Sequence, residues 1–216
     1  MNRTPDPKPV HDAAHRRDWP AYFDRIEGNP PRETLVHALD LFDAEDPAES
    51  RTAADIGCGS GRDTQCLLER GWRVWAQDGS IDGLERARAR PEIAGAVADG
   101  RAELVHADYS DIEIPPVDLV NASFSLPFCP PDAFRELWRG IDAAIPVGGR
   151  FSGQFFGDRD SWAMIEDRTH LTRAETLALF DQYILEHLKE EDRPSAADTE
   201  PHKHWHVFHI VALKRA

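Results

Sequence analysis

Residues 55–63, with the sequence DIGCGSGRD, decide the fold of this chain. They follow a short strand-like run, Thr52–Ile56, and lead into a helix-like run, Arg62–Arg70, which Gly71 ends. Glycines between a strand and a helix allow a tight turn, and they let a ligand approach the backbone where a Cβ atom would clash. This stretch therefore predicts a strand–loop–helix unit whose loop binds a ligand.

Strand-like and helix-like runs continue to alternate after this unit, with short connections. The expected strands are Arg73–Gln77, Glu103–Ala107, Val117–Ala122 and Arg150–Phe156, and the expected helices are Ser80–Arg90 and Pro131–Ile145. Such alternation is typical of a parallel sheet with helices on both faces. Near the end, Thr172 and Glu175 form a capping box that begins another helix. Two strand-like runs, 183–189 and 204–213, follow, and the polar loop 190–203 between them predicts an antiparallel hairpin.

Acidic residues accompany the glycine loop at positions that suit a nucleoside ligand. Asp78 ends the second strand about 20 residues after Gly57, the distance at which an acid accepts both hydroxyls of a ribose. Asp108 ends the next strand, and ligands of open α/β sheets bind at the carboxyl ends of strands. The three acids Asp55, Asp78 and Asp108 are therefore expected at one edge of the sheet.

The spacing within the loop discriminates between nucleotide ligands. Dinucleotide sites use G-x-G-x-x-G, with a pyrophosphate at the helix N-terminus, whereas this loop has G-x-G-x-G. Asp55 stands before the loop, where it would repel a pyrophosphate but suit a ligand that carries an ammonium group. These features indicate S-adenosylmethionine as the cofactor.

Five stretches resemble the motifs of class I S-adenosylmethionine-dependent methyltransferases. They are DIGCGSGRDT (55–64), LLERGWRVWAQDGS (67–80), HADYSDI (106–112), VDLVNASFSLPF (117–128) and GGRFSGQFFG (148–157). Within that class, the chain is most similar to small-molecule methyltransferases of the tellurite-resistance and thiopurine-like type. The resemblance implies an α/β, Rossmann-like seven-stranded sheet, mostly parallel, with an antiparallel C-terminal hairpin and helices on both faces.

The resemblance also implies roles for residues at the matching positions. Asp55 and the loop glycines would surround the methionine amino group and sulfur, Asp78 would hold the ribose, and Asp108 would bind adenine beside Tyr109. Asn121 would lie near the methionine end and the acceptor. Trp19, Tyr22 and Arg25 belong to an aromatic segment that would cover the cofactor. The full set of expected cofactor-binding residues is Tyr22, Asp55, Gly57, Cys58, Gly59, Arg62, Asp78, Gly79, Asp108, Tyr109 and Asn121.

Length and composition predict one domain and limit its partners. The 216 residues are interpreted as a flexible tail (1–18) and a single methyltransferase domain (19–216), with an N-terminal lid and helix at 19–45. The net charge of −14 disfavours nucleic acid. The N-terminus has no signal-peptide pattern, no run is apolar enough for a membrane span, and the three cysteines form no disulfide or zinc pattern. A cytoplasmic protein without a bound metal is expected, and the sequence leaves its oligomeric state undetermined.

The acceptor is expected to be a small molecule. The fourth strand ends Asn121-Ala122-Ser123-Phe124, without the [Asn/Asp]-Pro-Pro-aromatic tetrad that holds an exocyclic amine of adenine or the amide of glutamine. Phe124, Phe128 and Phe155 are expected to form an apolar pocket mouth, and no catalytic base is assigned. A thiol, a chalcogen or an amine is expected as the nucleophile. Alternatives are an RNA or protein methyltransferase, a non-catalytic cofactor-binding protein and an NAD-dependent oxidoreductase.

A histidine cluster closes the chain in the stretch PHKHWHVFHI, which contains His202, His204, His206 and His209. We interpret these residues as solvent-facing side chains of the hairpin. Residues at alternate positions of a strand share one face, so a metal site is the alternative, as is a base for the acceptor.

Overall fold

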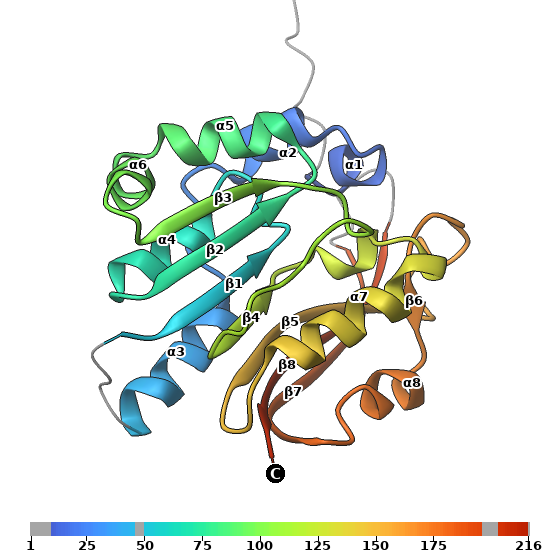
Figure 1. The fold of residues 1–216 in the computed structure, drawn as a ribbon. Coiled ribbons are helices and arrows are strands. Elements are labelled where there is room, and N and C mark those ends of the chain that lie inside the picture. The colour runs from blue at the N-terminus through green and yellow to red at the C-terminus, as the bar shows by residue number, and fades with distance from the viewer. Residues whose placement is uncertain (1–9, 46–49, 196–202, 216) are drawn as a thin grey trace, which may run out of the picture.

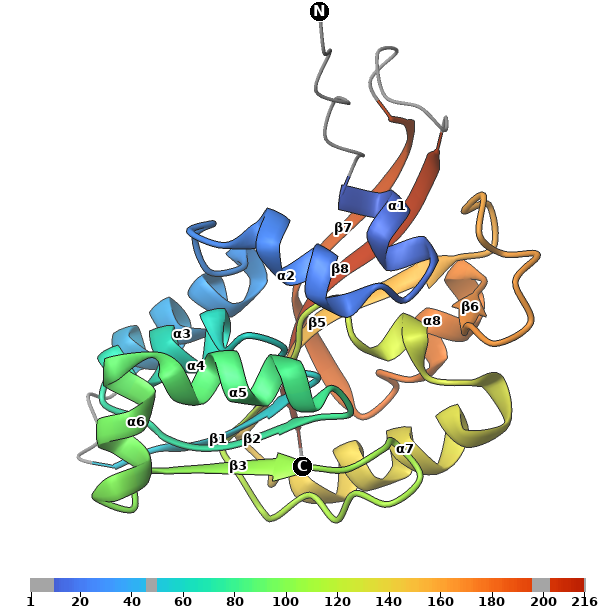
Figure 2. The same cartoon turned by 90° about the horizontal axis from the view of Figure 1, so that it is seen from above.

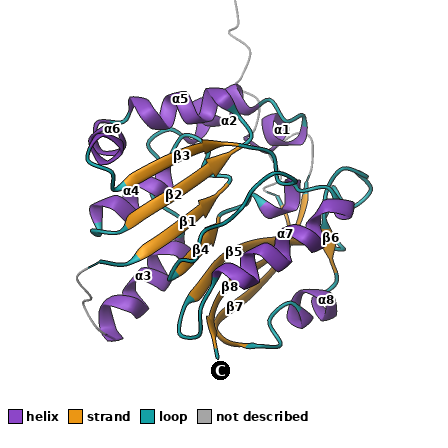
Figure 3. Ribbon diagram, viewed as in Figure 1, coloured by secondary structure: helices purple, strands orange, loops and turns teal. Residues whose placement is uncertain are grey.

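The computed structural model describes residues 10–45, 50–195 and 203–215, and the sheet at its centre confirms the expected Rossmann-like fold (Figures 1 and 3). Its strand order is β3-β2-β1-β4-β5-β8-β7, and a short eighth strand, β6, pairs with β5. The strands are β1 (Thr52–Ile56), β2 (Arg73–Asp78), β3 (Ala102–His106), β4 (Leu119–Ala122), β5 (Arg150–Gly157), β6 (His170–Leu171), β7 (Tyr183–Pro194) and β8 (His204–Lys214). Strands β1 to β6 pair in parallel, whereas β8 is antiparallel to both β5 and β7.

Helices cover both faces of this sheet (Figure 2). They are α1 (Val10–His15), α2 (Trp19–Ile26), α3 (Glu33–Glu45), α4 (Arg62–Glu69), α5 (Ile81–Ala89), α6 (Pro91–Ala98), α7 (Pro131–Ala144) and α8 (Arg173–Ala178), with a 3-10 turn η1 (Leu126–Phe128). Leu35, Leu67, Leu84 and Ile93 bring α3, α4, α5 and α6 into one core cluster. The other face carries α7, so the two clusters are separated by the sheet.

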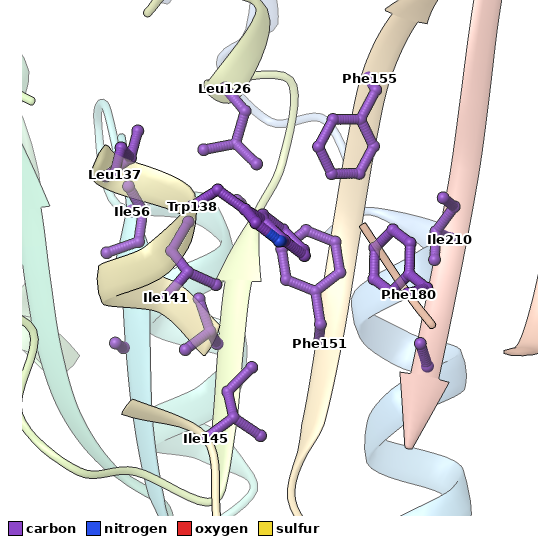
Figure 4. Packing of buried hydrophobic residues seen from close by; sticks show 14 of the residues in the cluster. Ile56, Leu126, Leu137, Trp138, Ile141, Ile145, Phe151, Phe155, Phe180 and Ile210 are labelled. Carbon is purple, nitrogen blue, oxygen red and sulfur yellow. The ribbon is translucent and has the colours of Figure 1, made fainter. Parts of the chain in front are cut away.

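The core under α7 is built from aromatic and branched side chains (Figure 4). Trp138 of α7 packs on Phe151 and Phe155 of β5, with ring centroids 5.3 and 5.8 Å apart, and on Phe180 at 5.1 Å. Offset aromatic pairs of this kind add to the stabilisation that burial of their area provides. This face of the sheet is closed by packing, which leaves the ligand site to the strand ends and the opposite face.

Two segments differ from the sequence-based expectations. Residues 10–15 form α1, with Ala13 and Ala14 buried, although a flexible tail was expected for residues 1–18; residues 1–9 of that tail lie outside the described ranges. Ala14 packs in a cluster with Val207 of β8, and that tertiary contact orders a helix too short to be stable alone. Strand β7 runs through Pro194 where a loop was expected from residue 190, because its charged residues still form a ladder with β8.

Candidate active site

A cavity of about 1340 Å³ opens at the carboxyl ends of the parallel strands and extends over the hairpin. Every expected cofactor-binding residue except Asn121 lines it. Its first part, the loop half, is formed by Asp55, Gly57, Cys58, Gly59, Arg62, Asp78, Gly79, Asp108 and Tyr109. Its second part, the hairpin half, is formed by Phe124, Gln154, Phe156, Trp162, His187, Lys189, Glu191, Trp205, Val207 and His209.

The loop between β1 and α4 can be built only with glycine at its turning points. Gly57 and Gly59 have φ angles of 68° and 55°, in the left-handed region that side chains disfavour. A Cβ atom on Gly57 would lie 2.3 Å from Cβ of Ser125, and one on Gly59 would lie 2.8 Å from Phe23 of α2. Glycine at these positions therefore lets Ser125 and Phe23 of α2 approach the loop backbone closely.

Asp78 joins the end of β2 to the loop. One carboxylate oxygen accepts a hydrogen bond from the Gly59 N–H at 2.7 Å, and the other accepts one from the Ser80 N–H, also at 2.7 Å. Burial raises the pKa of Asp78, while these backbone hydrogen bonds oppose the rise. Each carboxylate oxygen has a second lone pair, so Asp78 can still accept hydroxyl donors from a ligand in the cavity.

Asp55 and Asn121 are neighbours in the β1–β4 register and are bonded to each other. The Asn121 amide donates to one oxygen of Asp55 at 2.9 Å, and Thr64 donates to the other at 2.6 Å. Asn121 is fully buried and lies behind Asp55, so the structure does not place it on the cavity wall. The β1–β4 register places the two side chains next to each other near α4, and of the two only Asp55 lines the cavity.

A second carboxylate makes Asp55 hard to ionise. Asp63 of α4 is almost fully buried nearby, where it accepts hydrogen bonds from the Arg62 side chain at 3.0 Å and the Arg32 N–H at 3.2 Å. Burial, followed by the charge of Asp63, raises the pKa of Asp55 to about 7. A cationic ligand group beside Asp55 would relieve that repulsion and favour its charged form.

Asp108 and Tyr109 follow β3 and complete the loop half. Tyr109 donates from its hydroxyl to the Ser125 carbonyl at 2.9 Å, which fixes its ring against the cavity. Asp108 is exposed, and its carboxylate lies close to Gly79, where an added Cβ atom would come within 3.1 Å of it. Gly79 thus gives Asp108 access to the same space as Asp78.

Aromatic side chains from distant segments wall the far part of the cavity. Trp19 and Tyr22 of α2 line it as expected, whereas Arg25 does not. Phe124 and Phe128 line it too, but Phe155 was expected there wrongly: it is buried in the core under α7 (Figure 4). Successive strand residues point to opposite faces, so Phe156 occupies the cavity wall in its place.

A β-bulge in β7 brings the hairpin half together. Tyr183 and Leu185 pack toward the α7 core, yet His187 and Lys189, at the same odd positions, line the cavity. The register shifts between Leu185 and His187, and this extra residue reverses which face the later side chains occupy. Period-two analysis of the sequence could not find these residues, because the bulge breaks the period.

Phe124 and Arg32 form the junction between the two halves. Phe124 follows the end of β4 with a φ angle of 53°, an unusual conformation for a residue with a bulky side chain. The Gln154 side chain accepts a hydrogen bond from its N–H at 3.0 Å and holds it in place. The Arg32 guanidinium lies over its ring, 4.5 Å from the centroid.

The interpretation of the histidines as solvent-facing is wrong for His209, which lines the cavity, and for His206. His206 is fully buried, because its ring packs against Gly157 on the neighbouring strand. Its Nδ1 accepts from the Arg159 N–H at 3.1 Å, and its Nε2 lies 3.0 Å from Glu190. His204 pairs with Asp192 at 2.6 Å on the surface, and His202 lies outside the described residues.

Two further observations concern metal ions and membranes. In residues 10–45, 50–195 and 203–215, no group of three or more histidine, cysteine, aspartate or glutamate side chains is arranged to hold a metal ion. None of the helices in the same ranges is long and apolar enough to cross a membrane.

Comparison with known proteins finds a family model that matches the part of the chain carrying most of the loop half. Residues 53–149 match the family model described as "Methyltransferase domain". A probable ribosomal RNA small subunit methyltransferase A of Methanospirillum hungatei is 36% identical over 125 residues, which cover 58% of this chain and 46% of that protein. A carboxy-S-adenosyl-L-methionine synthase of Pseudomonas paraeruginosa is 30% identical over 126 residues, 56% of this chain and 50% of that protein. The chain thus spans about half the length of these curated relatives.

Solved structures share the fold over most of the chain. TehB from Haemophilus influenzae superposes with a TM-score of 0.70 at 14% identity, covering 90% of this chain and 66% of that one. A 1,6-didemethyltoxoflavin-N1-methyltransferase from Burkholderia thailandensis, solved with its substrate and S-adenosylhomocysteine, gives a TM-score of 0.62 at 22% identity and covers 100% and 94%. Residues 53–149 thus match a methyltransferase domain, and the fold is the one shared by TehB and this methyltransferase. It is the fold that the resemblance of the sequence motifs implied.

Proposed function

We propose that this protein transfers the methyl group of S-adenosylmethionine to a small-molecule acceptor. The main support is that one cavity of about 1340 Å³ joins the loop half, with its strand-end acids, to the aromatic hairpin half. Most single-ligand pockets occupy roughly 300–1,000 Å³, so this cavity has room for two ligands side by side. Methyl transfer requires such an arrangement, because both reactants must be held in line.

The loop half fits the cofactor by its shape and charge. Gly57 and Gly59 line the cavity in turns that leave no room for a Cβ atom, and Asp55 lies where a methionine ammonium group would offset its repulsion from Asp63. Asp78 with Gly79 would hold the ribose, Asp108 and Tyr109 the adenine, and Cys58 and Arg62 would flank the chain between them. The bound cofactor supplies an electrophilic methyl group, and the protein orients it.

Arg32 supplies the cation that the methionine carboxylate needs. Among the described residues, no carboxylate lies within salt-bridge distance of its guanidinium, and its buried Nε has no hydrogen-bond partner. Burial, followed by the charge of Arg62, lowers the pKa of Arg32, and Tyr22 and Asp63 oppose this change. A carboxylate in the cavity would satisfy both the charge and the Nε donor.

The segment 19–45 would act as the lid of this domain. Phe23 of α2 already lies against the glycine loop, and it lines the cavity together with Trp19 and Tyr22 of the same helix. Movement of α2 would therefore open the cofactor site without disturbing the sheet. The three cysteines are unpaired thiols, as a protein of the reducing cytoplasm would have.

The small acceptor is supported by charge and by chamber lining. A net charge of −14 opposes a polyanion, and the aromatic walls of the hairpin half suit a compact, partly apolar molecule. An RNA acceptor is the second candidate, because the 36% identical relative is named as a ribosomal RNA methyltransferase. A putative methyltransferase of Haloferax volcanii, solved in complex with the Trm112 methyltransferase activator, superposes with a TM-score of 0.63 at 19% identity. A methyltransferase that works with an activator protein is therefore a further alternative.

Calorimetry and a transfer screen test the proposal in sequence. S-adenosylmethionine and S-adenosylhomocysteine should bind at micromolar concentrations, whereas NAD should not. Radiolabelled methyl transfer is then measured on thiols, phenols, oxyanions of selenium and tellurium, heterocyclic amines, ribosomal RNA, transfer RNA and protein extracts. Turnover confined to RNA or protein would contradict the small-molecule acceptor, and cofactor binding with no turnover on any class would favour a non-catalytic binder.

A further inference from the structure

His209 of β8 occupies the position in the cavity where an acceptor would meet the end of β4. Its register partner on β5 is Gln154, whose side chain holds the N–H of Phe124. The His209 ring also stands edge-on to Phe124, with centroids 6.0 Å apart and planes at 78°. His209 is thus one strand away from the residue that joins the loop half to the hairpin half.

The polar atoms of this ring are not committed to the protein. Nε2 is buried and has no hydrogen-bond partner among the described residues; the nearest carboxylate oxygen, of Glu191, lies 3.8 Å away. Glu191 sits diagonally across the β7–β8 ladder and also pairs with Arg193 at 3.0 Å. A carboxylate on the Nε2 side favours the tautomer with its proton there, which leaves the Nδ1 lone pair as an acceptor.

Burial, more than the surrounding charges, keeps this ring neutral. Burial is the main cause that lowers the pKa of His209 to about 4; Lys189 and His187 of β7 and Arg32 before α3 add to it, and Glu191 opposes it. The other two histidines of the cavity, His37 and His187, pack against each other with centroids 5.4 Å apart. Only His209 combines a free acceptor atom with a place beside Phe124 in the described cavity wall.

We infer that His209 accepts the proton of the methyl acceptor, which is therefore a neutral molecule with a hydroxyl or a heterocyclic N–H. This inference rests on the proposed function. It also replaces the expectation of a nucleophile that needs no base.

The proton and electron movements balance. The acceptor oxygen or nitrogen forms the new bond to the methyl carbon, and the electron pair of the broken carbon–sulfur bond stays on sulfur. The acceptor proton passes to Nδ1 of His209, and the imidazolium charge is met by Glu191. Attack on the methyl group makes the acceptor atom cationic and strongly acidic, so even a weakly basic imidazole can remove the proton.

Two matched probes, phenol and anisole, test this assignment in the presence of saturating S-adenosylhomocysteine. They differ by the single O–H group that His209 would bind. Because one hydrogen bond contributes about 0.5–1.5 kcal/mol, phenol should bind about two- to tenfold more tightly than anisole to the parent protein. His209→Phe should abolish that preference, and His209→Gln, which still offers an acceptor oxygen, should keep part of it.

The matched control is His204→Gln on the same strand, since His204 is bonded to Asp192 outside the cavity lining. Nitrogen NMR of histidine in the parent alone adds a measurement that no variant can compromise by misfolding. The Nδ1 of His209 should be proton-free at pH 7 and should shift with phenol but not with anisole. Equal binding of the probes by the parent, or a preference that survives in His209→Phe, would overturn the inference. Failure of S-adenosylhomocysteine itself to bind would instead overturn the proposed function.

Discussion

The two halves of the cavity are built by different means, although they share one wall at Phe124. The loop half is made mostly of loop backbone and of acids at the carboxyl ends of β1, β2 and β3, which are consecutive strands along the chain. The hairpin half is made of side chains that β5, β7, β8 and the segment before α3 bring together. Local chain geometry therefore determines the first half, and tertiary packing determines the second.

The largest effect is expected from a side chain in the loop half. Gly57→Ala combines a left-handed φ of 68° with a Cβ atom 2.3 Å from Ser125. Because the loop or Ser125 must shift to relieve this clash, S-adenosylhomocysteine affinity should fall by at least about a hundredfold, a loss near 3 kcal/mol in calorimetry.

Gly71→Ala is the matched control for Gly57→Ala. Gly71 has a similar φ of 84°, but nothing lies within 4 Å of an added Cβ atom. It should cost about 1–2 kcal/mol of unfolding free energy in urea denaturation and leave cofactor affinity unchanged. Equal affinity losses in the two variants would mean that global stability, and not the glycine loop, sets binding.

The next effect sharpens the role of the strand-end acids. Asp78→Asn removes the charge that would accept two ribose hydroxyls, and hydrogen bonds to charged groups contribute about 1.5–3 kcal/mol. Calorimetry should show a tenfold to hundredfold loss of S-adenosylhomocysteine affinity. Asp99→Asn, a surface acid that bonds Arg101, should bind as the parent does, and an Asp78→Asn variant with parental affinity would show that Asp78 does not hold the ribose.

These differences explain what the sequence could predict. The glycine spacing, Asp78 and Asp108 can be identified from the sequence, because the carboxyl ends of parallel strands meet at one edge of the sheet, where ligands bind. Asn121 was wrongly expected at the cavity. Its contact with Asp55 depends on the β1–β4 register, which cannot be read from the sequence. His187 and Glu191 were missed because the bulge in β7 reverses their face, and Arg32 because only the fold brings it over Phe124.

A pH effect on stability separates the hairpin half from the rest of the molecule. In the folded protein the pKa of His209 is about 4, whereas an unfolded histidine has a pKa of about 6.5. Between these values the unfolded chain binds more protons, so this contribution to stability is present above pH 6.5 and is lost as the pH falls toward 4.

Urea denaturation at pH 7 and pH 4.5 measures that contribution. The parent should lose about 2 kcal/mol more than His209→Gln over this interval, because glutamine does not titrate. His204→Gln should follow the parent, since His204 is partly exposed and paired with Asp192. Identical pH dependence in the parent and His209→Gln would mean that the ring is solvated and that the hairpin half is open to water.

The smallest effect is expected where the lid meets the loop half. Tyr22→Phe removes the hydroxyl that faces the Arg32 guanidinium but keeps the ring that packs edge-on against Trp19, 5.9 Å away. Because Tyr22 would act on the cofactor through Arg32, S-adenosylhomocysteine affinity should fall only by about two- to tenfold, the effect of about 0.5–1.5 kcal/mol. Tyr183→Phe, whose hydroxyl bonds Asp142 outside the cavity, is the matched control and should leave affinity unchanged. A larger loss in Tyr22→Phe than in Asp78→Asn would reverse the ranking and make the lid, not the strand-end acid, the main holder of the cofactor.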